Sequence, residues 1–345
     1  MPEDFRLLLI IILVSIITSF AILGNAFTLL VYHRKRRLNP RVRGYLILMA
    51  LSDLAAPLTS NWMYIHSSLH GSWQFERFGC NVYGASQGFC ALVSIVTVAV
   101  VALERAFAVL MPNKMSRGGG RQGLLCLFCI AYSLAAVLPP LFGWSRLAFD
   151  LLAFQMYVLD GYGTSCCFEF VRQDVASRSY VAYLFLIGFG VPVAALCFSF
   201  NVVYRFVQRR LAAAAALNLR EQSMNRLSSN APALEEWAAS HSDAIAAFPP
   251  VLSPTHRREV AEGQAASKYL RERRLLYINF LIVSGFMLAW SPYALMALVS
   301  QMMGRQPGPA ISTFSSILAK TSTCLNPLIY AIADTQFMFP SHYCL

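Results

Sequence analysis

Charged residues are scarce in this chain. Aspartate, glutamate, lysine and arginine make up 13% of the 345 residues, whereas hydrophobic residues make up 57%. Soluble domains carry about 25% charged residues. The low charge and the mean hydropathy of +0.52 exclude an ordinary soluble protein. Backbone groups inside lipid must be hydrogen-bonded within the protein, so long apolar stretches are expected to be helices. The composition therefore predicts an all-α membrane protein.

Other features are also missing. The chain has no internal repeats and no Asn-x-Ser/Thr sequon. It lacks the paired, interrupted half-spans with which many transporters build their binding sites, which argues against a transporter. Its N-terminal apolar stretch is too long for a cleavable signal and is followed by no cleavage site, so we expect it to remain as a membrane span.

Seven stretches reach the roughly 20 apolar residues that a transmembrane helix needs. We therefore expect residues 1–345 to form one domain, a bundle of seven transmembrane helices. The stretches are about Phe5–Tyr32, Tyr45–Ser67, Cys80–Leu110, Leu124–Trp144, Tyr180–Val207, Leu275–Met303 and Pro309–Ala333.

The positive charge is unevenly distributed. The formal net charge is +11, and the cations cluster after span one, between spans three and four, and around the junction of spans five and six. The positive-inside rule places these loops in the cytoplasm and the N-terminus outside. Because the cations flank membrane spans, they predict contacts with anionic lipids and exclude a nucleic-acid partner. Residues 208–266 are expected to form a long, largely disordered third cytoplasmic loop with helical extensions at both ends, and residues 333–345 a short cytoplasmic tail.

Lys320 lies inside the last span, in the stretch "SSILAKTSTCLNPLIYAI". An ionisable group at such a position costs roughly 2.5–3.5 kcal/mol on insertion scales. One interpretation is a lysine that extends its ammonium group to the membrane surface. Apolar sequence continues on both sides, however, which makes that surface hard to reach. We therefore expect a buried amine that is paired, neutral or covalently modified.

Cysteines outside the spans point to a disulfide. Cys80 begins span three, and Cys166 and Cys167 lie in the loop before span five. An external loop is in an oxidising compartment, which favours a bridge from Cys80 to either Cys166 or Cys167.

Polar and proline residues recur at the centres of spans. Asn25, Asp53 and Asn326 are interpreted as hydrogen-bonding links between helices. Pro292 and Pro327 each remove a backbone hydrogen bond and predict a kink.

Charged residues also mark the cytoplasmic ends of two spans. Glu104 and Arg105 form either a solvated pair or, with Glu272, a lock that holds spans three and six together.

Several motifs together resemble the rhodopsin-like G-protein-coupled receptors over all seven spans: "GN", "LSDLAAP", Cys80, "ERA", "AWSPYA" and "NPLIY". The stretch "AKTSTCLNPLIY" is similar to opsins, in which retinal is bound by a lysine six residues before this asparagine. The resemblance implies a receptor, not an enzyme, without a metal site, in the plasma membrane or a photoreceptive membrane. Its expected partners are a heterotrimeric G protein, arrestin and a receptor kinase.

The resemblance gives Lys320 a chemical role. Its amine would condense with retinal to a Schiff base, with 11-cis-retinal in the dark and all-trans-retinal after light. A protonated Schiff base needs an anion. Tyr83 stands where vertebrate visual pigments carry an acid, so Asp160 is the expected counterion and Tyr83 its hydrogen-bonding neighbour. Alternatively Asp160 is a solvated loop acid, with Glu169 and Asp174 as the next candidates. Asp53 lies too far toward the cytoplasmic side.

The family positions also imply a pocket and a switch. The spacing from Asp160 favours Cys166 over Cys167 as the partner of Cys80. The expected pocket residues are Gly88, Ala91, Phe168, Phe185, Phe189, Trp290 and Tyr293. The residues expected to act in G-protein coupling and activation are Glu104, Arg105, Glu272, Asp53, Asn326, Pro327 and Tyr330.

Three departures from the family pattern keep other functions open. Ala106 replaces a usual Tyr or Trp, Phe200 replaces a tyrosine of span five, and residues 147–156 look like an insertion. The first two departures leave room for a retinal photoisomerase with weak signalling. A receptor for a diffusible ligand is the other alternative, and Lys320 argues against it.

Overall fold

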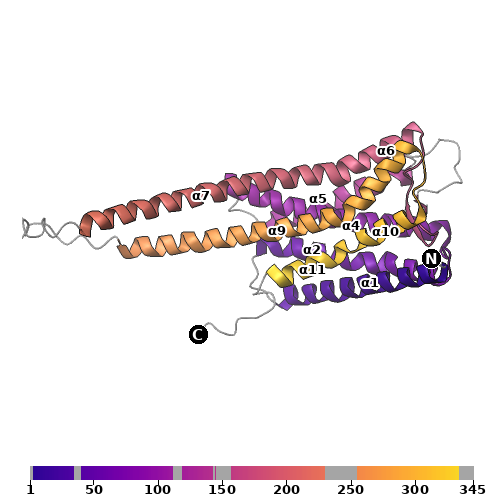
Figure 1. Cartoon of the computed structure of the whole chain (residues 1–345), viewed down its shortest axis with the longest axis horizontal. Helices are drawn as coiled ribbons and strands as arrows, with labels where there is room; N and C mark the ends of the chain where they lie inside the picture. The colour runs from indigo at the N-terminus through magenta and orange to yellow at the C-terminus, as the bar shows by residue number, and fades with distance from the viewer. Residues whose placement is uncertain are drawn as a thin grey trace, which may run out of the picture. The chain divides into compact units, whose positions relative to one another are not determined.

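The computed structural model describes residues 3–34, 40–111, 119–142, 144, 157–229 and 255–333. The side chains of some helical residues, including Glu272 and Tyr330, lie outside this description. The chain divides into two compact units, Met1–Phe200 with Tyr277–Leu345, and Asn201–Leu276. The first unit contains every candidate site residue whose side chain is described. Figure 1 shows the helices gathered into a bundle.

The helices follow the seven expected spans, but three spans consist of more than one helix. The long helices of the bundle are α1 (Glu3–Arg34), α4 (Glu76–Leu110), α5 (Gly119–Val137) and α9 (Thr255–Met303). Span two combines α2 (Pro40–Ala56) and α3 (Trp62–Leu69), span five combines α6 (Val175–Phe185) and α7 (Val191–Ser229), and span seven combines α10 (Pro309–Lys320) and α11 (Ser322–Ala333).

Four described helical stretches are each long and apolar enough to cross a membrane: Asp4–Arg34, Glu76–Leu110, Val175–Arg209 and Phe280–Met303. In the stretch Asp4–Arg34 only 17% of the most apolar window is buried inside the protein. Leu23 and Phe20 on α1 are 71% and 67% exposed, as expected for a helix whose outer face contacts lipid.

Two spans contain a short π-helical segment. Pro57–Asn61 separates α2 from α3, and Leu186–Gly190 separates α6 from α7. The first segment begins at a proline, which has no N–H to continue the regular hydrogen-bond ladder. Such π-segments often occur at functional sites. Here the first one carries Ser60, which faces span three.

Span seven is interrupted directly after Lys320. The backbone N–H of Thr321 bonds to the carbonyl of Leu318, three residues earlier, at 3.1 Å. The hydroxyls of Thr321, Ser322 and Thr323 also each donate to the carbonyl three residues earlier. Hydroxyl side chains compete with the helical ladder in this way. The "TST" run therefore accounts for the break between α10 and α11.

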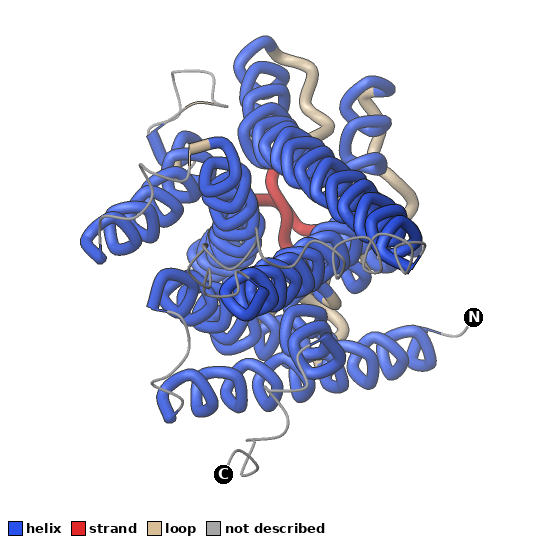
Figure 2. Tube along the Cα trace, turned by 90° about the vertical axis from the view of Figure 1, so that its left-hand side faces the viewer, coloured by secondary structure: helices blue, strands red, loops and turns tan. Residues whose placement is uncertain are grey.

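A β-hairpin closes one end of the bundle. Strands β1 (Tyr157–Asp160) and β2 (Ser165–Phe168) pair antiparallel, with Asp160 opposite Ser165. The turn contains two glycines with positive φ, Gly161 at 60° and Gly163 at 77°, a conformation that side chains with a Cβ disfavour. In the view of Figure 2 the two strands lie among the helices, and β1 and β2 both contact α4.

The core of the bundle is built around α4. Its central residues from Leu92 to Val100 are buried, and they pack against α2 and α5. The apolar cluster beneath the hairpin is separate and includes Tyr64, Tyr83 and Tyr157. The hairpin and this cluster place the candidate site at one end of the bundle.

Helices extend spans five and six into the region between them. Within residues 208–266, α7 continues to Ser229 and α9 begins at Thr255. Helical extensions at both ends were expected, and the disorder expected in the rest of this range stays a prediction. Residues 230–254, the tail residues 334–345 and the suspected insertion at 147–156 lie outside the described residues.

Candidate functional site

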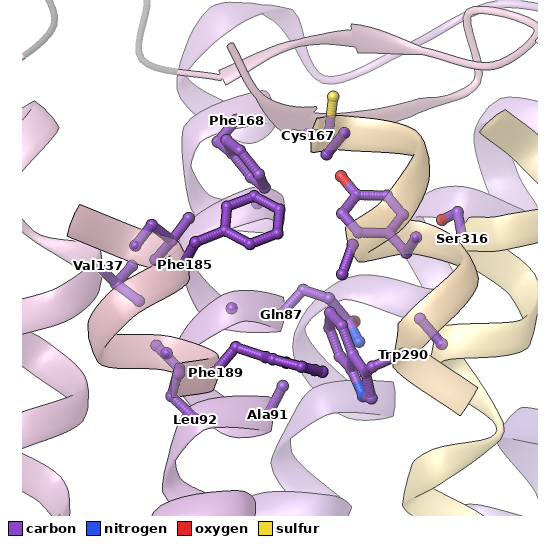
Figure 3. Close-up of a pocket in the computed structure, with 18 of the residues that line it drawn as sticks. Gln87, Ala91, Leu92, Val137, Cys167, Phe168, Phe185, Phe189, Trp290 and Ser316 are labelled. Atoms are coloured by element: carbon purple, nitrogen blue, oxygen red, sulfur yellow. The ribbon is translucent and has the colours of Figure 1, made fainter. Parts of the chain in front are cut away.

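A cavity of about 170 Å³ lies between the hairpin, α4, α9, α10 and the span-five segments. All seven expected pocket residues line it, together with Lys320 and Tyr83. Phe168 of the hairpin lies at one end, and Phe189 and Trp290 lie at the other (Figure 3). The walls are mostly apolar and aromatic, and Gly88 and Ala91 of α4 leave room between them.

Lys320 is the last residue of α10 and is 2% exposed, so its amine is buried rather than extended to the membrane surface. Its Nζ donates a hydrogen bond to Oε1 of Gln87 at 3.1 Å. The same nitrogen lies 4.9 Å from the ring centre of Tyr83 and 5.7 Å from that of Tyr64. Both distances allow an attraction between a cation and an aromatic face.

Gln87 and Tyr64 are site residues that the sequence analysis missed. Gln87 lies on α4 four residues after Tyr83, which places the two side chains on the same helix face. The spacing from Tyr83 could therefore have identified Gln87 as a site residue. The contact of Gln87 with Ser60, at 2.7 Å, could not be foreseen, because it depends on the π-segment of span two.

The carboxylate of Asp160 is buried beneath the hairpin turn. It accepts hydrogen bonds from the hydroxyl of Ser312 on α10 and from the backbone N–H of Gly161, the latter at 2.8 Å. Burial raises the pKa of Asp160, whereas these two hydrogen bonds and the charge of Lys320 act to lower it. Burial outweighs these effects.

Asp160 is therefore not a solvated loop acid, since it is only 8% exposed. Its role as counterion remains a prediction. Tyr83 differs from expectation, because its hydroxyl makes no hydrogen bond to any described residue. The physical reason is its orientation: the ring face of Tyr83, rather than its hydroxyl, meets the amine of Lys320.

The two alternative acids make local hydrogen bonds. Glu169 accepts from the backbone N–H of Val171 at 2.9 Å. Asp174 caps the N-terminus of α6 through the backbone N–H of Ser177, also at 2.9 Å. Both carboxylates thus support the loop backbone around the hairpin.

Cys80 and Cys166 form a disulfide that joins α4 to strand β2, with a Cα–Cα distance of 5.5 Å. Cys167 is a free thiol and lines the cavity instead. Burial raises the pKa of Cys167 well above its usual range, and the nearby charge of Asp160 adds to this effect. The two candidates for the bridge therefore have different environments, one in the disulfide and one in the pocket wall.

An aromatic path leads from the hairpin to the helix break. Phe168 packs edge-on against Tyr293, and Tyr293 packs edge-on against Trp290 with 6.1 Å between ring centres. The indole N–H of Trp290 donates to the hydroxyl of Ser322 at 3.1 Å. Ser322 follows Lys320 by two residues, so the cavity wall and the interruption of span seven are directly connected.

Deeper in the bundle, the buried polar residues link spans as expected. Asn326 donates to the carboxylate of Asp53 at 2.7 Å and to Ser94 at 3.3 Å. Asn25 donates to the backbone carbonyl of Thr323 at 2.9 Å. These hydrogen bonds join spans one, two, three and seven just below the helix break.

Pro327 packs close to Gly24, where an added Cβ would approach the proline ring to 3.0 Å. The side chain of Tyr330 is not among those that the structure describes.

The expected charge lock between spans three and six stays a prediction. Glu104 lies 4.0 Å from Arg121 of α5, a partner that the sequence analysis did not propose. The side chain of Glu272 lies outside the described side chains. Among the described residues there is no group of three or more side chains that could hold a metal ion.

Comparisons with known proteins agree with this geometry. The model of the family "7 transmembrane receptor (rhodopsin family)" matches residues 24–330. The chain is 24% identical over 329 residues to "Rhodopsin, GQ-coupled" of Mizuhopecten yessoensis, covering 94% of this chain and 56% of the relative. It is 26% identical over 318 residues to the melanopsin of Phodopus sungorus, covering 91% of this chain and 57% of the relative.

The chain therefore spans little more than half the length of these curated relatives. Among solved structures, squid rhodopsin superposes with a TM-score of 0.73 at 25% identity, covering 98% of this chain and 84% of that chain. The match of the family model extends from span one to the end of span seven. This chain is thus a multi-pass membrane protein that belongs to the rhodopsin family of seven-transmembrane receptors, a family of receptors rather than enzymes.

Proposed function

We propose that this protein is a light-sensing receptor that binds retinal through a Schiff base on Lys320 and activates a heterotrimeric G protein. The observation that carries the proposal is the buried amine of Lys320 at the wall of an aromatic cavity. The likeness to rhodopsins and melanopsins supports it. The basic clusters support an orientation with the G-protein-facing side in the cytoplasm.

The residues of the cavity fit an elongated, apolar aldehyde. Phe168, Phe185, Phe189 and Trp290 offer aromatic faces, and Gly88 leaves space between them. Pockets of this kind bind ligands mainly through apolar walls and orient them with a few polar groups. Burial also disfavours the charged form of an amine and so favours the nucleophilic form of Lys320.

Retinal would supply an aldehyde that condenses with the amine, with loss of one water molecule, and a polyene that changes shape on absorbing light. The chain's own residues hold the linkage. Gln87 accepts a hydrogen bond from the lysine nitrogen, and the ring of Tyr83 faces it. Asp160 is the proposed counterion and acts through space on Lys320. The hairpin lies over one end of the cavity (Figure 3).

The path from the cavity to the cytoplasmic side begins at Trp290. This residue contacts the cavity, bonds to Ser322 at the break in span seven and lies two residues before Pro292. A change of shape in the cavity would bias the positions of spans six and seven, which shifts the population toward an active arrangement. Arg105 and Glu272 are the proposed cytoplasmic elements of that switch, and Asp53, Asn326 and Pro327 its transmembrane elements.

The attachment site can be tested by reduction and peptide mapping. Protein incubated with 11-cis-retinal in the dark is treated with borohydride and digested, and the peptides are weighed. We expect a retinyl group on the peptide that contains Lys320 and on none of those that contain Lys35, Lys114 or Lys268. The Lys320→Ala variant should carry no retinyl group. Covalent pigment in that variant would refute the assignment.

A retinal photoisomerase is the second candidate, favoured by two residues of the bundle. Ala106 is completely buried, so a small side chain fills the position of a larger family residue. Phe200 packs against Phe280 with 5.7 Å between ring centres, and it has no hydroxyl with which to stabilise an active state. Light-dependent nucleotide exchange on a G protein distinguishes the receptor from an isomerase that releases one retinal isomer without such exchange.

A further inference from the structure

The nitrogen of Lys320 is surrounded by neutral groups. Among the described residues, its contacts are the amide oxygen of Gln87 and the ring faces of Tyr83 and Tyr64. The carboxylate of Asp160 is engaged by Ser312 and by the hairpin turn. A buried cation is costly unless it is hydrogen-bonded. The contact with Gln87 therefore contributes to how well this site holds a positive charge, together with the more distant charge of Asp160.

A second residue fixes the amide of Gln87. The Ser60 hydroxyl lies 2.7 Å from Oε1 of Gln87 and also 2.7 Å from the backbone carbonyl of Ala56. A hydroxyl has one proton, so it donates to only one of these two acceptors at a time. When Ser60 donates to Ala56, its oxygen is free to accept a hydrogen bond from the NH₂ group of Gln87.

The amide of Gln87 can thus face Lys320 in two ways. In one orientation its oxygen accepts from a protonated nitrogen, while Ser60 donates to that same oxygen. In the other, its NH₂ group donates to the lone pair of an unprotonated nitrogen and to the oxygen of Ser60. An ionised carboxylate could only accept. An amide therefore satisfies both protonation states of the nitrogen without adding charge.

We propose that Gln87 is the direct hydrogen-bond partner of the Lys320 nitrogen in both protonation states and that Ser60 positions the Gln87 amide. The inference rests on the proposed function for its spectral consequence, but the contact itself exists without retinal. The visible and ultraviolet forms of the pigment are then expected to interconvert within an ordinary pH range, because the contact group is neutral.

Other groups around the nitrogen also titrate. Tyrosines and cysteines are normally neutral near pH 7. The charge that remains when Gln87 is replaced is therefore that of Asp160. Among the described residues, Tyr64 of α3 and Tyr83 of α4 present their rings to Lys320, and Asp160 of the hairpin acts on it through its charge. Cys167 of the hairpin and Tyr293 of α9 line the same cavity.

The first experiment is a spectral titration of the full chain with 11-cis-retinal in the dark. Gln87→Glu should raise the midpoint of the visible-to-ultraviolet conversion by about 1–3 pH units, because an opposite charge at this distance favours the cation. Gln87→Leu should lower the midpoint, and Ser60→Ala should lower it less. Ser86→Ala is the matched control, since within the described part of the chain the Ser86 side chain hydrogen-bonds only to the carbonyl of Tyr83 on its own helix and does not line the cavity.

The second experiment needs no retinal. The full chain is treated with formaldehyde and cyanoborohydride over a range of pH, and methylation of the Lys320 peptide is followed by mass spectrometry. The pH of half-maximal rate should rise in Gln87→Glu, fall in Gln87→Leu and stay constant in Ser86→Ala. If the protein forms no pigment with retinal, the proposed function is wrong. The pH dependence of the methylation rate still tests the contact between Gln87 and Lys320.

Glutamate and glutamine have nearly the same shape. The Gln87→Glu variant should therefore change the charge of the site without changing its packing. A methylation midpoint that is unchanged or lowered in Gln87→Glu overturns the inference. So does an unchanged midpoint in Gln87→Leu. A shift in Ser86→Ala as large as that in Gln87→Leu would also overturn it, because the effect would then come from general disturbance of α4.

Discussion

At the residue scale, two side chains act on the nitrogen of Lys320 in different ways. Gln87 touches it at 3.1 Å, whereas Asp160 acts on it through space from beneath the hairpin turn. In a medium of low dielectric constant, a negative charge stabilises a nearby cation more than a neutral amide does, even without direct contact. The direct contact is that of Gln87, and we propose Asp160 as the source of the counter-charge.

Replacing Asp160 by Asn should convert the pigment from visible-absorbing to ultraviolet-absorbing at neutral pH. The substitution removes the negative charge but keeps an acceptor for Ser312, so the hairpin should remain in place. Loss of the charge should lower the midpoint of the spectral titration by about 1–3 pH units. The measurement is the absorption spectrum of the dark pigment in chloride-free buffer.

Two matched variants serve as controls for Asp160→Asn. Glu169→Gln neutralises a nearby acid that bonds to the loop backbone, and it should leave the spectrum in the visible range. Tyr83→Phe should change the spectrum little, because the Tyr83 hydroxyl makes no hydrogen bond to a described residue. A visible, protonated pigment in Asp160→Asn would show that Asp160 is not the counterion, and Glu169 would then be the next acid to test.

Much of the site could be predicted at the residue scale, because the family motifs fix sequence positions along the helices. All seven expected pocket residues line one cavity with Lys320. The partners of Lys320 could not be predicted in the same way. Gln87 and Tyr64 meet the amine, and Ser60 meets Gln87, only because side chains of spans two, three and seven converge there. Spacing within span three places Gln87 on the same helix face as Tyr83, but it does not show that Ser60 and Tyr64 of span two lie beside that face.

At the scale of elements, the unpredicted features are interruptions of helices. Pro57 gave a signal for the π-segment of span two, and the "TST" run gave one for the break after Lys320. Hydropathy averages over about 20 residues and so describes each span as one helix. The interruptions matter because one places Ser60 beside Gln87 and the other places Ser322 beside Trp290.

The N-cap of α6 offers a prediction about pH. Burial would raise the pKa of Asp174, but hydrogen bonds from the backbone and side chain of Ser177 and the charge of Arg172 lower it below its usual range. For a carboxylate whose folded-state pKa is lowered, the stabilisation is present above the unfolded-state pKa, about 3.9. It is lost as the pH falls through the folded-state pKa. Asp174 should therefore stabilise the hairpin end of span five at neutral pH and lose this effect in acid.

We expect Asp174→Ala to reduce the stability of the protein at about pH 7 by about 0.5–2 kcal/mol, the usual cost of losing an N-cap. Asp174→Asn should cost less, because an amide oxygen can still cap the helix. Thermal unfolding in detergent is the measurement. The difference in melting temperature between the wild type and Asp174→Asn should become smaller as the pH falls below about 4. A gap that stays constant at every pH would mean that the charge of Asp174 does not contribute.

The whole molecule combines a covered cavity with a hydrogen-bonded path through the bundle. The disulfide Cys80–Cys166 ties the hairpin to α4 above the cavity. Below it, Trp290 and Ser322 connect spans six and seven, and Asn326 connects span seven to Asp53. The seven-helix architecture could be predicted from hydropathy alone, whereas this path depends on which polar side chains face one another.

This arrangement suggests how a change in the cavity reaches the rest of the bundle. A cavity that changes shape can act only on residues whose contacts differ between two arrangements of the bundle. We propose Trp290 as such a residue, because it contacts both the cavity and the break in span seven. The lock of Arg105 with Glu104 and Glu272 at the cytoplasmic end remains a prediction.

The most direct test of a light-sensing function is a difference spectrum. The full chain is expressed, supplied with 11-cis-retinal in the dark and measured before and after illumination, with Lys320→Ala treated in parallel. We predict an absorption band, separate from that of free retinal, that shifts on illumination in the wild type and is missing in Lys320→Ala. A wild type without such a band, or a band that persists in Lys320→Ala, would contradict the account.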